Sequence, residues 1–221
     1  MEDNKDNKAR SKRASKNYTE QIPEVRELKE IDLSGSYSYA HYLRWKFEER
    51  IELIKGKIFE MSAPATFHQE VSRELFGALY NYLKGHKCKV FCAPFDIRFP
   101  KGSKADRDIY NVVQPDICVI CDLRKLDRKG CLGAPDLVVE ILSPGNSRKE
   151  LRIKYELYQE FGVREYWIVD PNSKMVLKHI LSTSGMYVTE QFTISGGMFT
   201  SDLLPGFSLN LDEIFSSDVQ P

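Results

Sequence analysis

The stretch QPDICVI (residues 114–120) and, after a polar excursion, APDLVVEILSP (residues 134–144) contain two apolar runs of strand length. Each run carries one carboxylate that such a run should avoid: Asp116 opens the first, and Glu140 lies inside the second. A carboxylate in a buried strand costs free energy unless it is paired, hydrogen-bonded or bound to a cation. The pattern therefore indicates that both acids have a partner.

A helix is predicted directly after the second strand. Ser147 and Glu150 form a Ser-x-x-Glu capping box, which places the helix start near Arg148. Gly162 is a natural end for the same helix.

The apolar face of that helix is interrupted by Lys154. The lysine falls at i+3 on a stripe whose other members follow helical spacing: Leu151, Tyr155 and Tyr158. Two acids and an ammonium group, each placed against the local pattern, are explained together by a site for a metal ion and a phosphate. The alternative is that Lys154 extends out of the stripe to reach water.

Two Pro-Asp pairs compete for the first acidic position, Asp116 and Asp136. Asp136 and Glu140 would share one strand and one face, but four residues separate them by roughly 13 Å. Two ligands of one ion must each lie at about 2 Å from it. Asp116 comes from a different strand that is able to run beside Glu140, so we favour Asp116 with Glu140.

Two oxygen ligands leave most of an octahedral shell open for water and a substrate phosphate. That arrangement suits Mg²⁺ or Mn²⁺. The chemistry it favours is in-line attack on a phosphodiester, in which Lys154 orients or activates the nucleophile and offsets negative charge.

Composition limits the possible function classes. The chain has 221 residues, with 32 basic and 32 acidic side chains, so any DNA-binding surface must be local. Residues 1–22 are basic and almost free of large apolar groups, which predicts a disordered tail ahead of a single domain at 23–221. No apolar run approaches the roughly 18 residues of a membrane span. We expect a cytoplasmic protein with no membrane partner and no small-molecule cofactor.

Five cysteines with irregular spacing do not resemble a disulfide framework. Cys118 and Cys121 suggest zinc, but an offset of three along a strand sends their side chains to opposite faces. We therefore expect buried, reduced thiols.

The N-terminal half predicts a helix over 37–49 and a hairpin over 50–61 that turns at Lys55-Gly56. Glu52 alternates with apolar neighbours and is expected to face solvent. A helix is predicted over 66–84 and a strand over 88–99. His68 falls in the first turn of that helix, where a lone histidine is usually a surface or capping residue.

The C-terminal half predicts a strand over 165–169, a hairpin formed by 175–181 and 186–192, and an edge-packing segment over 203–215. Strands on both sides of a capped helix, with another helix before them, indicate an α/β fold: a mixed sheet flanked by helices.

Several short runs with turn residues and acids at fixed offsets occur in a distinctive order. They are Glu52-Leu53-Ile54-x-Gly56, His68-Gln69, Gln114-Pro115-Asp116, Ala134-Pro135-Asp136 continuing through Glu140 to Pro144, Lys154-x-x-x-Tyr158, and Gly162-Val163-x-Glu165-Tyr166-Trp167-Ile168-Val169-Asp170-Pro171.

Over residues 36–212 this set resembles the Uma-two family of restriction endonucleases, part of the PD-(D/E)xK nuclease superfamily. The resemblance implies a restriction-endonuclease-like core with added N-terminal and C-terminal β-hairpins, and Asp116 and Glu140 as metal ligands. In the superfamily pattern a lysine falls two residues after the second acid, where this chain has Leu142. The resemblance suggests that Lys154 supplies it instead. The resemblance also implies an acidic contact from Glu52. It matches His68 to a histidine that recurs in the family, whose role the residues alone do not explain.

These observations predict a divalent-metal-dependent endonuclease that hydrolyses phosphodiester bonds in DNA and acts as a homodimer. Arg148, Lys149 and Arg152 would contact phosphates, or would form the solvated face of a helix. The alternative function is an interaction module that keeps the nuclease fold with little or no catalysis. In that case Lys154 would be the counter-ion of a buried acidic pair.

Overall fold

The computed structural model describes residues 22–143, 148–194 and 196–216. The chain divides into two compact units: Met1–Met61 with Arg98–Val113, and Ser62–Ile97 with Gln114–Pro221. The predicted basic tail and the predicted cap Ser147 lie outside the described residues. The single-domain assignment of 23–221 stays a prediction.

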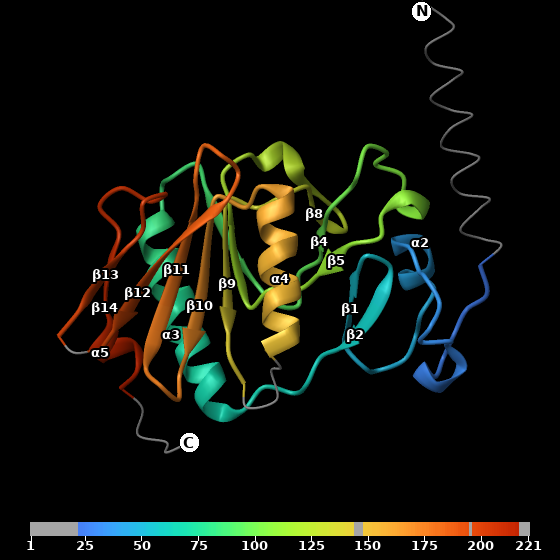
Figure 1. Ribbon diagram of the computed structural model, residues 1–221, viewed down its shortest axis with the longest axis horizontal. Helices are drawn as coiled ribbons and strands as arrows, with labels where there is room; N and C mark the ends of the chain where they lie inside the picture. The colour runs from blue at the N-terminus through green and yellow to red at the C-terminus, as the bar shows by residue number, and fades with distance from the viewer. Residues whose placement is uncertain (1–21, 144–147, 195, 217–221) are drawn as a thin grey trace, which may run out of the picture. The chain divides into compact units, whose positions relative to one another are not determined.

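The second unit is built on a mixed sheet in which the described strands follow the order β12-β11-β10-β9-β6-β3 (Figure 1). Only the β9–β10 pair is parallel among these neighbours. The strands are β3 Lys89–Cys92, β6 Ile117–Ile120, β9 Leu137–Ile141, β10 Glu165–Asp170, β11 Met175–Leu181 and β12 Tyr187–Thr193. The predicted mixed sheet is confirmed.

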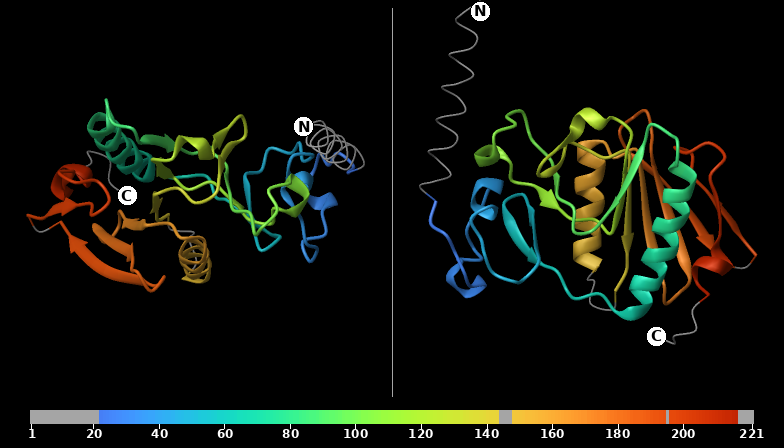
Figure 2. Two further views of the ribbon diagram at one scale, coloured as in Figure 1. Left: turned by 90° about the horizontal axis from the view of Figure 1, so that it is seen from above. Right: turned by 180° about the vertical axis from the view of Figure 1, so that it is seen from behind.

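Two long helices cover opposite faces of this sheet, α3 (Thr66–Leu83) and α4 (Arg148–Phe161), as the three views in Figures 1 and 2 agree. Both helices match their predicted ranges closely. Gly162, with φ of 80°, ends α4 in the left-handed conformation that glycine adopts without steric cost. None of the described helices has the length and apolar character needed to cross a bilayer.

The face of the sheet toward α3 holds the hydrophobic core. Side chains alternate along β9, so Leu137, Val139 and Ile141 join the core cluster with α3, while Val138 and Glu140 point to the face that α4 covers. Residues of the C-terminal segment complete the cluster: Leu204, Phe207, Leu209, Leu211, Ile214 and Phe215. This segment carries β14 (Ser208–Asn210), which pairs with β13 (Met198–Thr200), and α5 (Leu211–Ile214).

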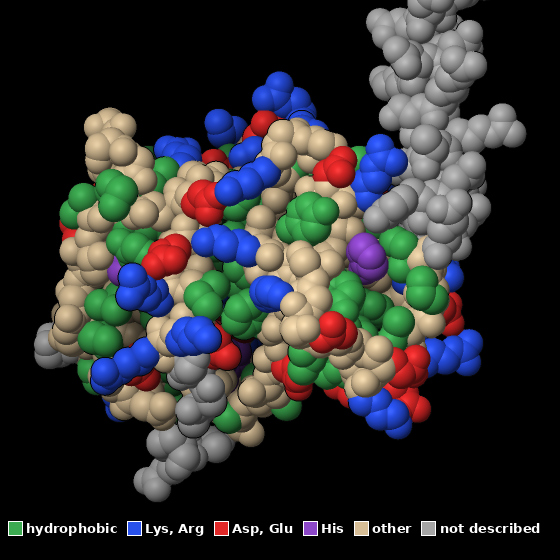
Figure 3. Space-filling view, turned by 45° about the vertical axis from the view of Figure 1, so that its right-hand side comes forward, with side chains coloured by type: hydrophobic (Ala, Val, Ile, Leu, Met, Phe, Trp, Pro, Cys, Tyr) green, Lys and Arg blue, Asp and Glu red, His purple; other side chains and the backbone are tan. Residues whose placement is uncertain are grey.

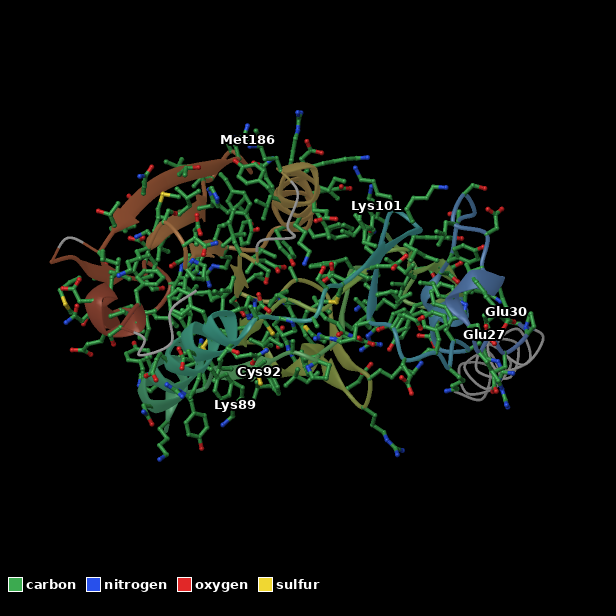
Figure 4. The ribbon with its side chains drawn as sticks, turned by 90° about the horizontal axis from the view of Figure 1, so that it is seen from below. Glu27, Glu30, Lys89, Cys92, Lys101 and Met186 are labelled. Atoms are coloured by element: carbon green, nitrogen blue, oxygen red, sulfur yellow. A yellow bond between two sulfur atoms is a disulfide. The ribbon has the colours of Figure 1, made fainter. Side chains whose placement is uncertain are left out.

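The predicted hairpin at the C-terminal side is confirmed by the antiparallel pairing of β11 with β12. Its turn carries Met186, which is 57% exposed and marked in Figure 4.

The predicted strand over 88–99 is wrong as a single element, because it splits into β3 and β4 (Ile97–Arg98). Pro94 lies between them, and proline has no backbone N–H to donate to a ladder. Lys89 and Cys92, the ends of β3, are marked in Figure 4. The remaining short elements are η2 Asp106–Asp108, η3 Leu123–Lys125, β7 Leu126–Asp127 and β8 Gly130–Leu132.

The expectation of reduced thiols is wrong for two cysteines, because Cys88 and Cys121 form a disulfide. β3 and β6 are antiparallel with Lys89 opposite Ile120, so the residues just outside this pair face one another. Sequence spacing did not reveal this contact, which depends on the strand register. Cys92, Cys118 and Cys131 are not disulfide-bonded. Burial raises the pKa of the Cys118 thiol well above its usual value, with contributions from the other two thiols.

In the first unit, the predicted hairpin is confirmed as β1 (Ile51–Ile54) and β2 (Lys57–Glu60). Lys55 and Gly56 both have positive φ, as a two-residue type I′ turn requires. β1 also pairs with β5 (Val112–Val113), so it is flanked on both sides. The expectation that Glu52 faces solvent is wrong, since its side chain lies in this fully buried strand and the residue is 3% exposed.

The predicted helix over 37–49 is also wrong. It shortens to α2 (Tyr39–Tyr42), preceded by η1 (Leu28–Glu30). Beyond α2, Lys46 donates its backbone N–H to the carbonyl of Val25 instead of continuing a helix. The rings of Tyr37, Tyr42 and Phe47 pack around Trp45, and this local aromatic packing replaces the helical stripe that the spacing suggested.

Candidate active site

Asp116 directly precedes β6, and Glu140 lies in β9, the antiparallel neighbour of β6. β6 pairs with β9 so that Ile117 faces Val139, and extending this register by one residue brings Asp116 opposite Glu140. Oδ2 of Asp116 accepts a 2.7 Å hydrogen bond from the backbone N–H of Ile141, which ties the carboxylate to the neighbouring strand. The predicted adjacency of these two strands is confirmed.

His68 contributes to the surroundings of Asp116 from the first turn of α3. Its Nε2 lies 3.4 Å from Oδ2 of Asp116, and the residue is only 7% exposed. The expectation of a surface or capping role is therefore wrong. Among the described residues, Nδ1 of His68 finds no hydrogen-bond partner, and none donates a hydrogen bond to Oδ1 of Asp116.

The charge state of His68 reflects two opposing effects. Burial lowers its pKa, but the hydrogen bond and negative charge of Asp116, with smaller contributions from the backbone of Ile141 and the charge of Glu140, raise it above the usual value overall. The neighbouring Asp116 carboxylate thus favours the charged form of His68 more than water would.

Two side chains of α4, Lys154 and Tyr158, contact the carboxylate of Glu140. Lys154 Nζ lies 2.9 Å from Oε1 and 3.1 Å from Oε2, and the Tyr158 hydroxyl donates a 2.6 Å hydrogen bond to Oε1. The glutamate is 8% exposed and the lysine side chain 15%. The lysine therefore points inward to the acid rather than out to water.

Asp136, the competing acid, makes different contacts. Its Oδ2 accepts a 2.8 Å hydrogen bond from the backbone N–H of Cys121, and its Oδ1 lies 3.5 Å from Arg164 Nη1. Both of its oxygens thus fix the start of β9. The choice of Asp116 over Asp136 as a metal ligand stays a prediction.

Glu52 belongs to the first unit, whereas Asp116, Glu140 and Lys154 belong to the second. The structure brings those three together, with His68 and Tyr158. A role for Glu52 at this site stays a prediction.

Tyr158 and His68 are contacts that sequence reasoning did not assign. For Tyr158 a signal was present, because it lies one helical turn beyond Lys154 on the same inward stripe. For His68 the signal was weaker, since nothing local shows that the first turn of α3 meets the end of β6.

The donor set is suited to a hard divalent cation. Asp116 and Glu140 offer carboxylate oxygens, the ligands that Mg²⁺ and Mn²⁺ prefer. No group of three or more His, Cys, Asp or Glu residues among those described is arranged to hold an ion. An ion at this site would therefore rely on the two carboxylates together with water and substrate oxygens, as an open catalytic site does.

The face of the molecule shown in Figure 3 carries no single broad basic patch among the residues that the structure describes. On the face shown in Figure 3, Lys and Arg side chains are interspersed with Asp and Glu. This distribution agrees with the balance of 32 basic and 32 acidic residues, and any contact with phosphates would be local.

The fold is that of restriction-endonuclease-like nucleases, with a mixed sheet, helices on both faces and paired acids at one end. Comparison with solved structures supports it. The crystal structure of "a putative nuclease belonging to DUF820" from Anabaena variabilis superimposes with a TM-score of 0.64 at 20% identity, covering 81% of this chain and 97% of that one.

The chain belongs to the Uma2 family, described as "Putative restriction endonuclease", whose model matches residues 39–212. A relative in Synechocystis sp., "Uncharacterized protein slr1290", is 24% identical over 177 residues, which span 79% of this chain and 88% of that protein. The resemblance noted from the sequence motifs is thereby confirmed.

Proposed function

We propose that the protein is a divalent-metal-dependent endonuclease that hydrolyses phosphodiester bonds in DNA. One observation carries the proposal: Asp116, just before β6, accepts a hydrogen bond from the Ile141 N–H beside Glu140 on β9, and Lys154 contacts Glu140 from α4. Membership of a family described as restriction endonucleases supports the same reaction class.

Asp116 and Glu140 would hold a Mg²⁺ or Mn²⁺ ion, which when bound supplies an activated water and neutralises charge on the phosphate. Asp116 is oriented for this by the Ile141 N–H, which occupies Oδ2. Lys154 would orient the nucleophile and offset negative charge that develops on the phosphate oxygens. Glu52 would add an acidic contact.

Substrate contacts would come from the start of α4. Arg148, Lys149 and Arg152 have exposed side chains there, and Arg152 forms an exposed ion pair with Glu156. Contacts of this type give affinity that falls with salt concentration and carry little base specificity.

The test is cleavage of supercoiled plasmid, single-stranded DNA and RNA with Mg²⁺, Mn²⁺ or EDTA. Wild type should cut DNA only with metal, and Asp116→Ala, Glu140→Ala and Lys154→Ala should each lose activity by roughly 10²–10³-fold. Asp136→Asn is the matched control: it changes the other Pro-Asp acid and should keep cleavage. An inert wild type, or equal loss in the control, contradicts the proposal.

A second candidate is an interaction module without catalysis. It is favoured by the contacts of Glu140, which already has Lys154 and Tyr158 as donors, as a purely structural buried acid would. Mn²⁺ separates the two functions: a nuclease site should gain thermal stability on binding the ion, whereas a salt-bridged pair should not.

The proposal also includes a homodimer, which would present one site to each strand of a duplex, and a cytoplasmic location. Light scattering of the purified protein tests the first, and cell fractionation tests the second.

A further inference from the structure

The donors to Glu140 differ in mobility. Tyr158 is fully buried, and its hydroxyl donates a 2.6 Å hydrogen bond to Oε1. Lys154 is bound to both oxygens but has a flexible stem and a side chain that is 15% exposed. Lysine therefore has a way to leave the carboxylate, whereas the tyrosine does not.

The Tyr158 ring is held by the packing between α4 and the sheet. Its centroid lies 4.9 Å from that of Tyr166 in an edge-to-face arrangement. The neighbouring rings of Tyr155, His179 and Tyr187 extend this aromatic cluster under the helix. A hydroxyl mounted on such a packed ring has a fixed direction, which pre-organises the group that it bonds.

We propose that Tyr158 is a positioning residue of the site, which keeps the Glu140 carboxylate in place by its bond to Oε1 when Lys154 moves away. The inference rests on the proposed function, in which Lys154 acts on the nucleophile and phosphate and so must release Glu140. The bond from Tyr158 would then keep Oε1, and with it the plane of the carboxylate, in the same place.

Tyr158→Phe tests this role because it removes the hydroxyl and keeps the packed ring. The matched control is Tyr187→Phe in the same cluster, where the hydroxyl donates a 2.9 Å hydrogen bond to the Val163 carbonyl and does not touch Glu140. Both variants lose one buried tyrosine hydrogen bond, so both should lower the melting temperature to a similar extent.

The readouts are Mn²⁺ affinity by titration calorimetry, and kcat and KM for plasmid cleavage. Tyr158→Phe should weaken Mn²⁺ binding by about 10-fold or more and lower kcat with little change in KM, because outer contacts of metal ligands have effects of this size. Tyr187→Phe should leave all three values unchanged.

Two results overturn the inference and are distinguishable. If wild type binds Mn²⁺ and cuts DNA while Tyr158→Phe behaves as Tyr187→Phe does, Tyr158 is only a packing residue and the proposed function stands. If wild type neither binds Mn²⁺ nor cuts, the proposed function fails and this role fails with it.

Discussion

Glu140 and Glu165 are buried glutamates on adjacent parallel strands, β9 and β10, and they point to opposite faces of the sheet. Glu165 is 1% exposed and accepts hydrogen bonds from Trp167 Nε1, Ser201 Oγ and the Leu203 N–H. All three donors are neutral. Glu140 instead contacts the ammonium group of Lys154 and the hydroxyl of Tyr158, and the residue after it, Ile141, donates its N–H to a second carboxylate, that of Asp116.

The pKa of Glu165 reflects its burial among neutral donors. Burial raises the pKa of Glu165 above its usual value, although the hydrogen bonds from Trp167, Leu203 and Ser201 and the charge of Lys178 oppose the shift. Glu165 thus ties the C-terminal segment to β10. Burial alone therefore does not mark a functional acid; the kind of donor and the presence of a second acid nearby distinguish Glu140 from Glu165.

Replacing each glutamate by glutamine should distinguish the proposed cation ligand, Glu140, from the structural acid, Glu165. The loss of cleavage in the Glu140 variant is the largest effect we expect. Glu140→Gln removes a proposed cation ligand and should lower metal-dependent cleavage by about 10³-fold. Glu165→Gln should keep cleavage, measured per folded molecule on supercoiled plasmid. Equal activity in the two variants would remove the distinction between them.

The Cys88–Cys121 disulfide lies on the core side of the sheet, toward α3. Removing it should lower stability and leave the proposed active site intact. Replacing Cys88 and Cys121 together by serine opens a bond between residues 33 apart, and should lower the free energy of unfolding by about 3–4 kcal/mol. Urea denaturation measures the change, with cleavage at low temperature as the control. A variant as stable as wild type would show that this disulfide contributes nothing in solution.

On the α4 face, His179 should make stability depend on pH. Burial lowers its pKa from 6.5 to about 4, so between these values the unfolded chain binds the extra proton. Stability is then fully present above pH 6.5 and is lost as pH falls toward 4, by up to about 3 kcal/mol. The difference in unfolding free energy between wild type and His179→Gln should shrink across that window, and a constant difference would contradict this.

The smallest effect should be on the stability of Glu165→Gln. An amide nitrogen in place of one oxygen faces a donor and loses its hydrogen bond, which costs about 1–3 kcal/mol. Thermal and urea unfolding test this value. A variant more stable than wild type would mean that the raised pKa of Glu165 reflects an unfavourable burial that its donors do not offset.

The candidate site could be predicted from the sequence where a residue breaks a local apolar pattern. Lys154 interrupted a helical stripe, and Glu140 interrupted a strand, so both positions could be identified as unusual. Asp116 was preferred over Asp136 as the partner of Glu140, because four residues of one strand would hold Asp136 roughly 13 Å from Glu140. Glu165 shows the limit, because its strand pattern is as unusual as that of Glu140 and only its donors explain it.

Contacts that depend on register or on tertiary packing were not predictable. The disulfide partner of Cys121 is far away in sequence, and only the β3–β6 register pairs them. His68 was expected at the surface because the meeting of α3 with β6 has no local signal. The helix predicted over 37–49 is wrong because the aromatic residues follow helical spacing, but the backbone beyond α2 bonds elsewhere, as Lys46 does to Val25.

The most direct test of the central claim is a crystal of the protein soaked in Mn²⁺, with anomalous diffraction used to locate the ion. We expect an anomalous peak between the carboxylates of Asp116 and Glu140, absent from crystals of Glu140→Gln, and no peak at Glu165. A peak elsewhere, or no peak in crystals whose Asp116 and Glu140 are accessible to solvent, would contradict it.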